Sequence, residues 1–152
     1  MGQKGFIYET ETLDYYLKES NPFVLWDGVF EFYYFENYGA AFGILQNQRI
    51  LLIAMTSIIF IAILWVLIRI PNTKRYLPIR IVGILVAAGA VGNFIDRIYH
   101  GYVIDFLYFK LINFPIFNLA DCYVVVSMVL LTLLICFYYK DEDFEVLKKK
   151  IV

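Results

Sequence analysis

The chain has 152 residues, of which 61% are hydrophobic and 19% aromatic, and its mean hydropathy is +0.67. A soluble domain of this size has too little polar surface to cover so apolar a chain, so a soluble globular protein is excluded. The net charge of −1 argues against a nucleic-acid partner, because binding phosphates requires a concentrated basic face. We expect one membrane-embedded domain, residues 1–152.

Three apolar segments can cross a membrane. Residues 50–68 and 122–139 carry no charged side chain, and each is long enough to span a hydrocarbon core of roughly 30 Å. Residues 81–95 reach that length once the polar positions beside them are included. The sequence therefore predicts an α-helical integral membrane protein with three transmembrane helices, at about 50–70, 79–99 and 119–139.

The distribution of charge predicts how these helices are oriented. The segment 69–80 has no acidic residue and four basic ones, so the positive-inside rule places it in the cytoplasm. These are Arg69, Lys74, Arg75 and Arg80. Residues 100–118 and the acidic segment 1–49 are then extracytoplasmic. The tail 140–152, with acids and bases mixed, is expected to be a solvated cytoplasmic end.

The N-terminal segment contains a predicted β-hairpin. Residues 23–36 alternate large apolar and polar side chains around Asp27-Gly28, a pair that favours the type I′ turn of a two-residue hairpin. We expect a small extracytoplasmic β-sheet here. An interfacial belt of Tyr and Trp without strands is the alternative.

Three aspartates stand near the ends of the predicted spans. A charged side chain at membrane depth costs on the order of 2.5–3.5 kcal/mol, so each one suggests a function. Asp96 and Asp105 would lie on opposite faces of an unbroken helix. Gly101 can end that helix, and the extended stretch after it can then bring Asp105 back toward Asp121.

Two carboxylates held together cannot both ionise easily, so such a pair has an acid and a base at neutral pH. An aspartic protease needs this arrangement: the ionised group activates water and the protonated group serves the leaving amine. Taken singly, each aspartate can instead be a helix-end group. Asp121 at a helix N-terminus would be favoured by the macrodipole alone.

The neighbouring polar residues have structural and functional interpretations. Asn93, Asp96 and Arg97 share a helix side and can form a self-neutralising group. Arg97 can instead hold a substrate carbonyl or a lipid phosphate. Asn118 can orient a carboxylate or cap the last helix, and Asn37 can donate amide hydrogen bonds to a closely approaching backbone.

No metal or cofactor is expected. His100 is the only histidine, and metal sites normally need several converging ligands. Cys122 and Cys136 are too far apart on one helix for a disulfide and are expected to be buried apolar residues.

Four motifs occur together in this order: "NYGAAFG", "GNFIDR", "GYVIDF" and "FNLAD". In this combination, over about residues 14–145, the chain resembles the bacterial lipoprotein signal peptidases, or signal peptidase II. The resemblance implies an aspartic endopeptidase of the bacterial cytoplasmic membrane, multi-pass, with its site on the extracytoplasmic side. Its substrate would be a lipid-modified prolipoprotein, its surroundings membrane lipid, and its inhibitor the cyclic peptide globomycin.

The resemblance also assigns site residues. The catalytic aspartates fall on Asp105 and Asp121. Residues that bind substrate or support the site fall on Asn37, Gly39, Asn93, Asp96, Arg97 and Asn118. Members usually have four helices, the first ending in an Asp with a Lys four residues later. Asp14 and Lys18 keep that spacing, but the residues before them are polar, so three spans are expected.

Three other functions remain open at this point. A small proton- or ion-coupled carrier would relay a cation through Asp96, Asp105 and Asp121. A membrane adaptor would only display the aromatic sheet. A family member altered at its N-terminus would keep the fold and lack activity.

Overall fold

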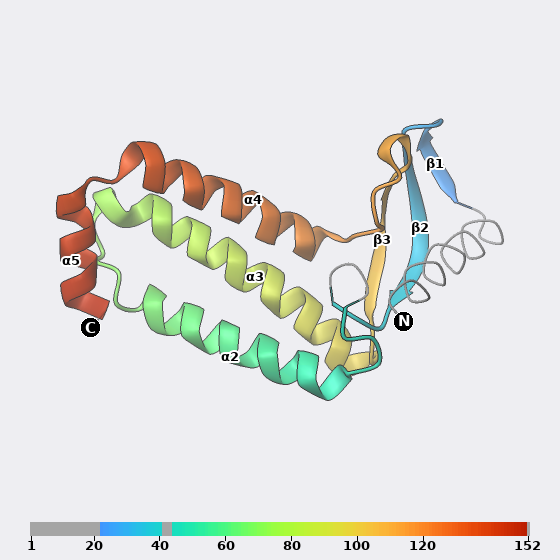
Figure 1. Cartoon of the computed structure of the whole chain (residues 1–152), viewed down its shortest axis with the longest axis horizontal. Coiled ribbons are helices and arrows are strands. Elements are labelled where there is room, and N and C mark those ends of the chain that lie inside the picture. The colour runs from blue at the N-terminus through green and yellow to red at the C-terminus, as the bar shows by residue number, and fades with distance from the viewer. Residues whose placement is uncertain (1–21, 41–43, 152) are drawn as a thin grey trace, which may run out of the picture. The chain divides into compact units, whose positions relative to one another are not determined.

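The computed structural model describes residues 22–40 and 44–151 (Figure 1). Two compact units can be distinguished. The sheet unit contains the described residues up to Leu52 together with Tyr99–Asn118, and the helix unit contains Ile53–Ile98 and the chain from Leu119 onward. That the whole chain forms one membrane-embedded domain stays a prediction.

The sheet unit is built on three antiparallel strands in the order β1-β2-β3. These are β1 (Phe23–Trp26), β2 (Phe30–Asn37) and β3 (Val103–Phe109). The first two form the hairpin that the alternation of apolar and polar residues predicts. The third comes from the stretch after Gly101, whose φ of +90° ends the preceding helix in the left-handed conformation that glycine adopts most easily.

The turn of the hairpin differs from the predicted type. Val29 N donates to Trp26 O at 3.0 Å, so Asp27 and Gly28 are the central residues of the turn, as expected. Gly28 has a φ of +68°, but Asp27 is not among the described residues with positive φ. A type I′ turn needs positive φ at both positions, so that prediction is wrong. The first residue pair beyond the turn is Trp26 with Phe30. The next pair is Val24 with Glu31, so β1 holds one extra residue between these two pairs.

The pairing of β2 with β3 contains a bulge. Phe32 pairs with Leu107 and Phe35 with Asp105, so β2 holds one residue more than β3 between these two pairs. On one side of the bulge Glu31 pairs with Tyr108, and on the other Asn37 lies at the end of the strand. The position of the extra residue therefore decides which β2 side chains face Asp105.

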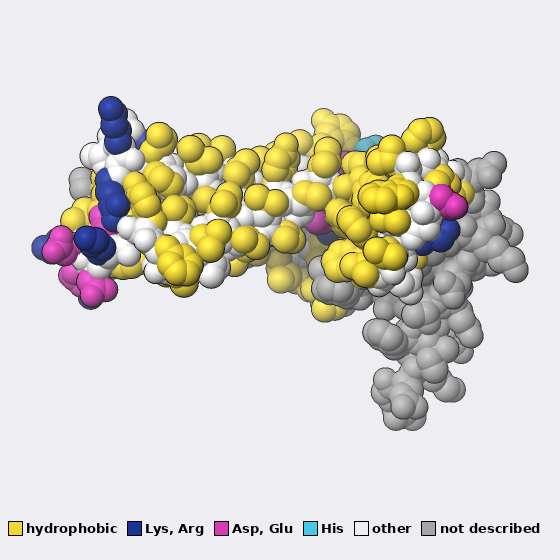
Figure 2. Space-filling model, turned by 90° about the horizontal axis from the view of Figure 1, so that it is seen from above, with side chains coloured by type: hydrophobic (Ala, Val, Ile, Leu, Met, Phe, Trp, Pro, Cys, Tyr) yellow, Lys and Arg dark blue, Asp and Glu magenta, His cyan; other side chains and the backbone are white. Residues whose placement is uncertain are grey.

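The helix unit contains most of the three helices that are long and apolar enough to cross a membrane (Figure 1). They are α2 (Arg49–Leu67), α3 (Leu77–Tyr99) and α4 (Leu119–Leu133). A short 3₁₀ turn, Lys74–Tyr76, extends α3 at its start, and a π-helix, Leu134–Tyr138, extends α4 at its end. Hydrophobic side chains cover the visible face of these helices (Figure 2). The predicted fold class, three spans with a small sheet, is confirmed.

Glycines allow α3 and α4 to pack closely. A Cβ at Gly89 would lie 2.5 Å from the backbone oxygen of Ala120 and 2.9 Å from the side chain of Val124. One turn later, a Cβ at Gly92 would lie 3.1 Å from Ala120. The start of α4 thus lies directly against α3, which brings Asp121 within reach of α3 side chains.

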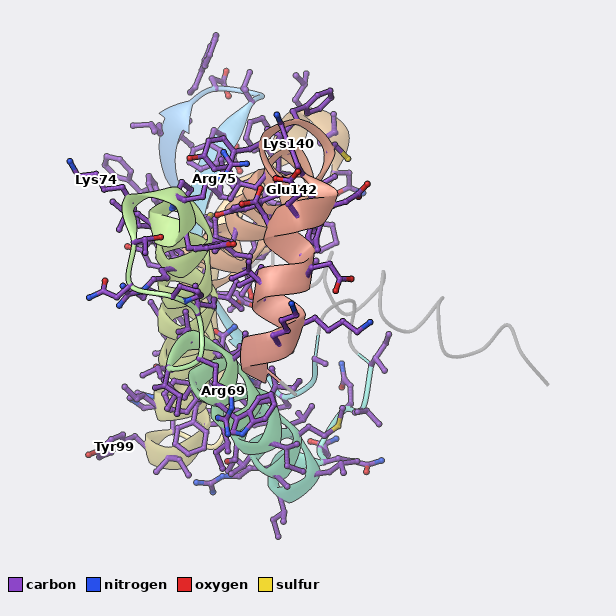
Figure 3. The ribbon with its side chains drawn as sticks, turned by 90° about the vertical axis from the view of Figure 1, so that its left-hand side faces the viewer. Arg69, Lys74, Arg75, Tyr99, Lys140 and Glu142 are labelled. Atoms are coloured by element: carbon purple, nitrogen blue, oxygen red, sulfur yellow. The ribbon has the colours of Figure 1, made fainter. Side chains whose placement is uncertain are left out.

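The C-terminal segment that the sequence predicts as a solvated end forms a further helix, α5 (Asp141–Ile151). Its Leu147 is buried in a cluster with Ile70, Tyr76 and Tyr139. Figure 3 views this end of the helices, with Arg75, Lys140 and Glu142 near the start of α5. The location of this end in the cytoplasm stays a prediction.

An ion pair connects α5 to the 3₁₀ turn Lys74–Tyr76 that precedes α3. Arg75 Nη2 lies 2.6 Å from Asp143 Oδ2, and Arg75 Nε donates to Oδ1 at 3.1 Å. The guanidinium also donates to the backbone oxygen of Tyr138 at 2.7 Å. The hydrogen bond from Arg75 lowers the pKa of Asp143 to about 2.

Candidate active site

Asp105 is a buried carboxylate of the sheet unit, with 2% of its surface exposed. Both of its oxygens accept hydrogen bonds from side-chain amides. Asn37 Nδ2 donates to Oδ2 at 2.9 Å, and Asn118 Nδ2 donates to Oδ1 at 2.7 Å. A buried carboxylate needs such donors, because burial removes its water.

The backbone fixes the first of these amides. Asn37 is the last residue of β2, and its Oδ1 accepts a hydrogen bond from the backbone nitrogen of Gly39 at 2.9 Å. With its carbonyl oxygen engaged there, the amide directs its NH₂ group to Asp105. Gly39 thus acts on the carboxylate through Asn37, a connection that the motif alone did not reveal.

Strand pairing places the second amide. Phe117 forms an isolated bridge with Leu107, in which each backbone nitrogen donates to the other residue's oxygen at 3.0 and 2.8 Å. Phe117 is thereby held beside β3, two residues along from Asp105. Asn118 follows it, is 4% exposed, and reaches Asp105. Of the two roles considered for Asn118, its amide is engaged in orienting a carboxylate.

Asp121 is the corresponding carboxylate of the helix unit. It lies in the first turn of α4, and its Oδ1 accepts a hydrogen bond from Asn93 Nδ2 of α3 at 3.0 Å. The spacing argument linked Asn93 only to its own helix and missed this contact. The glycines at positions 89 and 92, on the side of α3 that faces α4, were the signal that could have indicated it.

Arg97 and Asp96 lie in the last turns of α3. Arg97 is buried, with 8% of its surface exposed, and its Nη1 donates to the backbone oxygen of Asn93 at 3.2 Å. A buried guanidinium one turn beyond the residue that holds Asp121 is suited to binding carbonyl or phosphate oxygens. Whether Asp96 neutralises it, as the spacing predicts, stays a prediction.

The remaining predicted site residues and the expected pairing are not tested by these contacts. Asp105 belongs to the sheet unit and Asp121 to the helix unit, so the carboxylate pair stays a prediction. Asp14 and Lys18 lie outside the described residues. Within residues 22–40 and 44–151, no three His, Cys, Asp or Glu side chains are grouped so that they could hold a metal ion.

Three span-length helices and two amide-held carboxylates are features of a membrane enzyme that works with acid groups. The chain matches the family model described as signal peptidase (SPase) II over residues 4–137. It therefore belongs to the signal peptidase II family, whose members are aspartic-type membrane endopeptidases.

Curated relatives agree with this assignment. The chain is 44% identical over 117 residues to the lipoprotein signal peptidase of Brevibacillus brevis, covering 77% of this chain and 76% of the relative. It is 40% identical over 116 residues to that of Streptococcus thermophilus, covering 76% and 72%. The match to the Streptococcus pyogenes protein is 36% over 128 residues, covering 84% and 80%.

Solved structures have the same fold. A bacterial membrane enzyme determined by the in meso method at 2.3 Å resolution superposes with a TM-score of 0.70 at 28% identity, covering 86% of this chain and 82% of that one. A second, at 1.9 Å resolution, gives a TM-score of 0.68, also at 28% identity, and covers 88% of each chain.

Proposed function

We propose that this protein removes the signal peptide from lipid-modified prolipoproteins, with Asp105 and Asp121 as its catalytic pair. The observation that carries the proposal is the environment of Asp105. This carboxylate is almost fully buried, and both of its oxygens are held by amides from sequence segments far apart. Such donors fix the orientation of the carboxylate, which a general acid or base requires.

The proposed reaction needs no covalent intermediate. When Asp105 and Asp121 share one proton, the ionised carboxylate takes a proton from a water molecule, and the resulting hydroxide attacks the scissile carbonyl carbon. The protonated carboxylate hydrogen-bonds the carbonyl oxygen and then transfers its proton to the leaving amine. The carbon–nitrogen bond breaks, and the products are the free signal peptide and the mature lipoprotein.

The other family positions serve this pair. Asn37 and Asn118 fix the plane of the Asp105 carboxylate, and Asn93 fixes that of Asp121. Gly39 orients Asn37. Arg97 would contact the substrate or its lipid, Asp96 would support Arg97, and the same family resemblance assigns Asp14 and Lys18 a substrate-binding or supporting role.

The proposed location is the outer face of the bacterial cytoplasmic membrane. There the apolar signal peptide can lie among the spans while its cleavage point reaches water, and the acyl chains on the lipobox cysteine stay in membrane lipid. Globomycin would occupy the same pair as a substrate mimic.

Cleavage of a lipid-modified precursor by the purified protein in lipid tests the proposal. Asp105→Asn and Asp121→Asn should each lower the cleavage rate by about 10²–10⁴-fold, the range for losing a general acid or base. Both variants should still insert into the membrane. Asp141→Asn, an exposed carboxylate at the start of α5, serves as the control and should cleave normally. Cleavage at the wild-type rate by either site variant would refute the mechanism.

A further inference from the structure

A second buried carboxylate lies in the sheet unit, away from Asp105. Glu31 on β2 is 1% exposed, and its two oxygens have different partners. Lys110 Nζ, just beyond the end of β3, lies 2.6 Å from Oε1, and the hydroxyl of Tyr33 donates to Oε2 at 2.8 Å. The proposed reaction uses none of these groups.

Both members of this pair are charged over a wide pH range. The hydrogen bond from Lys110 lowers the pKa of Glu31, and the same bond raises the pKa of Lys110. The ion pair is therefore present at any pH between the ordinary pKa values of glutamate and lysine. Glu31 is the buried member of the pair and Lys110 is exposed. An ion pair with a buried member often adds little net stability, because desolvation offsets the attraction. Its best-attested use is to select one register among several.

The β2–β3 pairing is a place where register needs to be selected. Glu31 and Lys110 connect the two strands on one side of the bulge, and Asn37 and Asp105 connect them on the other. If the extra β2 residue lay beyond Asn37 instead, the Asn37 end would shift by one residue, about 3.3 Å, and its side chains would turn to the opposite face. Asn37 would then no longer meet Asp105.

Aromatic contacts hold the bulge at its observed position. Tyr33, which lies within the bulge, packs edge to face on Tyr108 with ring centroids 5.4 Å apart. Tyr33 donates to Glu31, and Tyr108 is the residue with which Glu31 pairs. The carboxylate of Glu31 therefore binds both Lys110 and the bulged residue Tyr33, and Tyr33 in turn packs on Tyr108 of β3.

We propose that Glu31 and Lys110 are positioning residues for catalysis: their ion pair fixes the register of β2 on β3 and so holds the Asn37 amide against Asp105. This inference rests on the proposed peptidase function. In this proposal the pair acts on the reaction through Asn37, and contact with substrate is not part of its role.

The first experiment measures kcat and KM for cleavage of the lipid-modified precursor. Lys110→Met should lower kcat by about 100-fold, the effect of displacing a catalytic group by roughly 1 Å, with KM nearly unchanged. Lys110→Arg keeps the charge and should restore most of the rate. Glu31→Gln combined with Lys110→Met leaves no unpaired buried charge, and it should show the same loss in a chain that still folds.

A matched ion pair supplies the control for stability. Arg75 and Asp143 are also 2.6 Å apart but lie in the helix unit. Arg75→Met should lower the melting temperature and leave kcat of the folded enzyme at the wild-type value. An equal loss of kcat in Arg75→Met and Lys110→Met, at equal loss of melting temperature, would reduce the proposed role to general stability.

A double-mutant cycle with Asn37 identifies the route of the effect. If the pair acts through Asn37, Lys110→Met in an Asn37→Ala background should lower kcat by less than about threefold, because the shared interaction is already lost. A repeated loss of about 100-fold in that background, or wild-type kcat in Lys110→Met alone, would overturn the inference. A wild-type protein that leaves the precursor uncut would instead refute the proposed function itself.

Discussion

The two units hold their aspartates in different ways. In the sheet unit, Asp105 depends on strand pairing, because β2 and the returning segment at Phe117 each bring an asparagine to it. In the helix unit, Asp121 depends on close helix packing, because glycines let α4 approach the helix that carries Asn93. The position of Asp105 is thus sensitive to the register of the strands, and that of Asp121 to side-chain volume between the helices. Different substitutions can therefore perturb one aspartate without the other.

Among the substitutions that distinguish the two units, removing an amide from Asp105 should have the largest effect. Asn118→Ala leaves one oxygen of a buried carboxylate without its donor, and hydrogen bonds to charged groups contribute about 1.5–3 kcal/mol. We expect kcat to fall by about 10–100-fold. Asn72→Ala, at an exposed loop position, is the control and should be unaffected. Unchanged kcat in Asn118→Ala would contradict the role given to this amide.

Adding volume between α3 and α4 tests the helix unit. The Cβ of Gly89→Ala would meet backbone oxygen, which cannot move aside easily, so a loss of about 1–3 kcal/mol in the free energy of unfolding is expected. Gly83→Ala is the matched control, since its Cβ would meet the flexible end of Leu67. Thermal unfolding in detergent should show the larger decrease for Gly89→Ala, and equal decreases would argue against close packing here.

The helix end at Gly101 connects the two kinds of structure. Gly101→Ala places a Cβ on a residue with φ of +90°, which costs on the order of 1 kcal/mol. A lower melting temperature is expected, together with a smaller loss of kcat than in Asn118→Ala. An unchanged melting temperature would show that this residue does not need the left-handed conformation.

Acidification should have the smallest effect, and in the helix unit it acts on the ion pair of Asp143. Asp143 has a pKa of about 2 in the folded protein, below its ordinary value of 3.8. Its contribution to stability is therefore complete above about pH 4 and is lost as the pH falls toward 2. The melting temperature of the wild type should fall more over this window than that of Asp143→Asn, and parallel curves would exclude the pair as the cause.

The sequence predicts what depends on local pattern. Apolar length predicts the three helices, alternation predicts the hairpin strands, and Gly101 predicts the end of α3. The predicted type of the hairpin turn is wrong, because the preference of the Asp27-Gly28 dipeptide contains no information about the irregularity of β1 beside the turn.

What the sequence could not predict depends on tertiary contacts. Glu31 and Lys110 are 79 residues apart, and no spacing rule connects them before β2 and β3 are paired. The amide of Asn93 was linked to its own helix because the close approach of α4 is a packing result. The mixed charges of residues 140–152 predict a solvated end, and they give no sign that Leu147 of α5 is buried.

We propose that the carboxylates of Asp105 and Asp121 meet, and cross-linking of cysteines at the two positions tests this proposal. In a chain with Cys122→Ala and Cys136→Ala, Asp105→Cys and Asp121→Cys should be joined efficiently in native membranes by a short bifunctional thiol reagent. Asp105→Cys combined with native Cys136, toward the far end of the same helical span, should not cross-link. Two thiols that react singly and never become joined would contradict the catalytic pair.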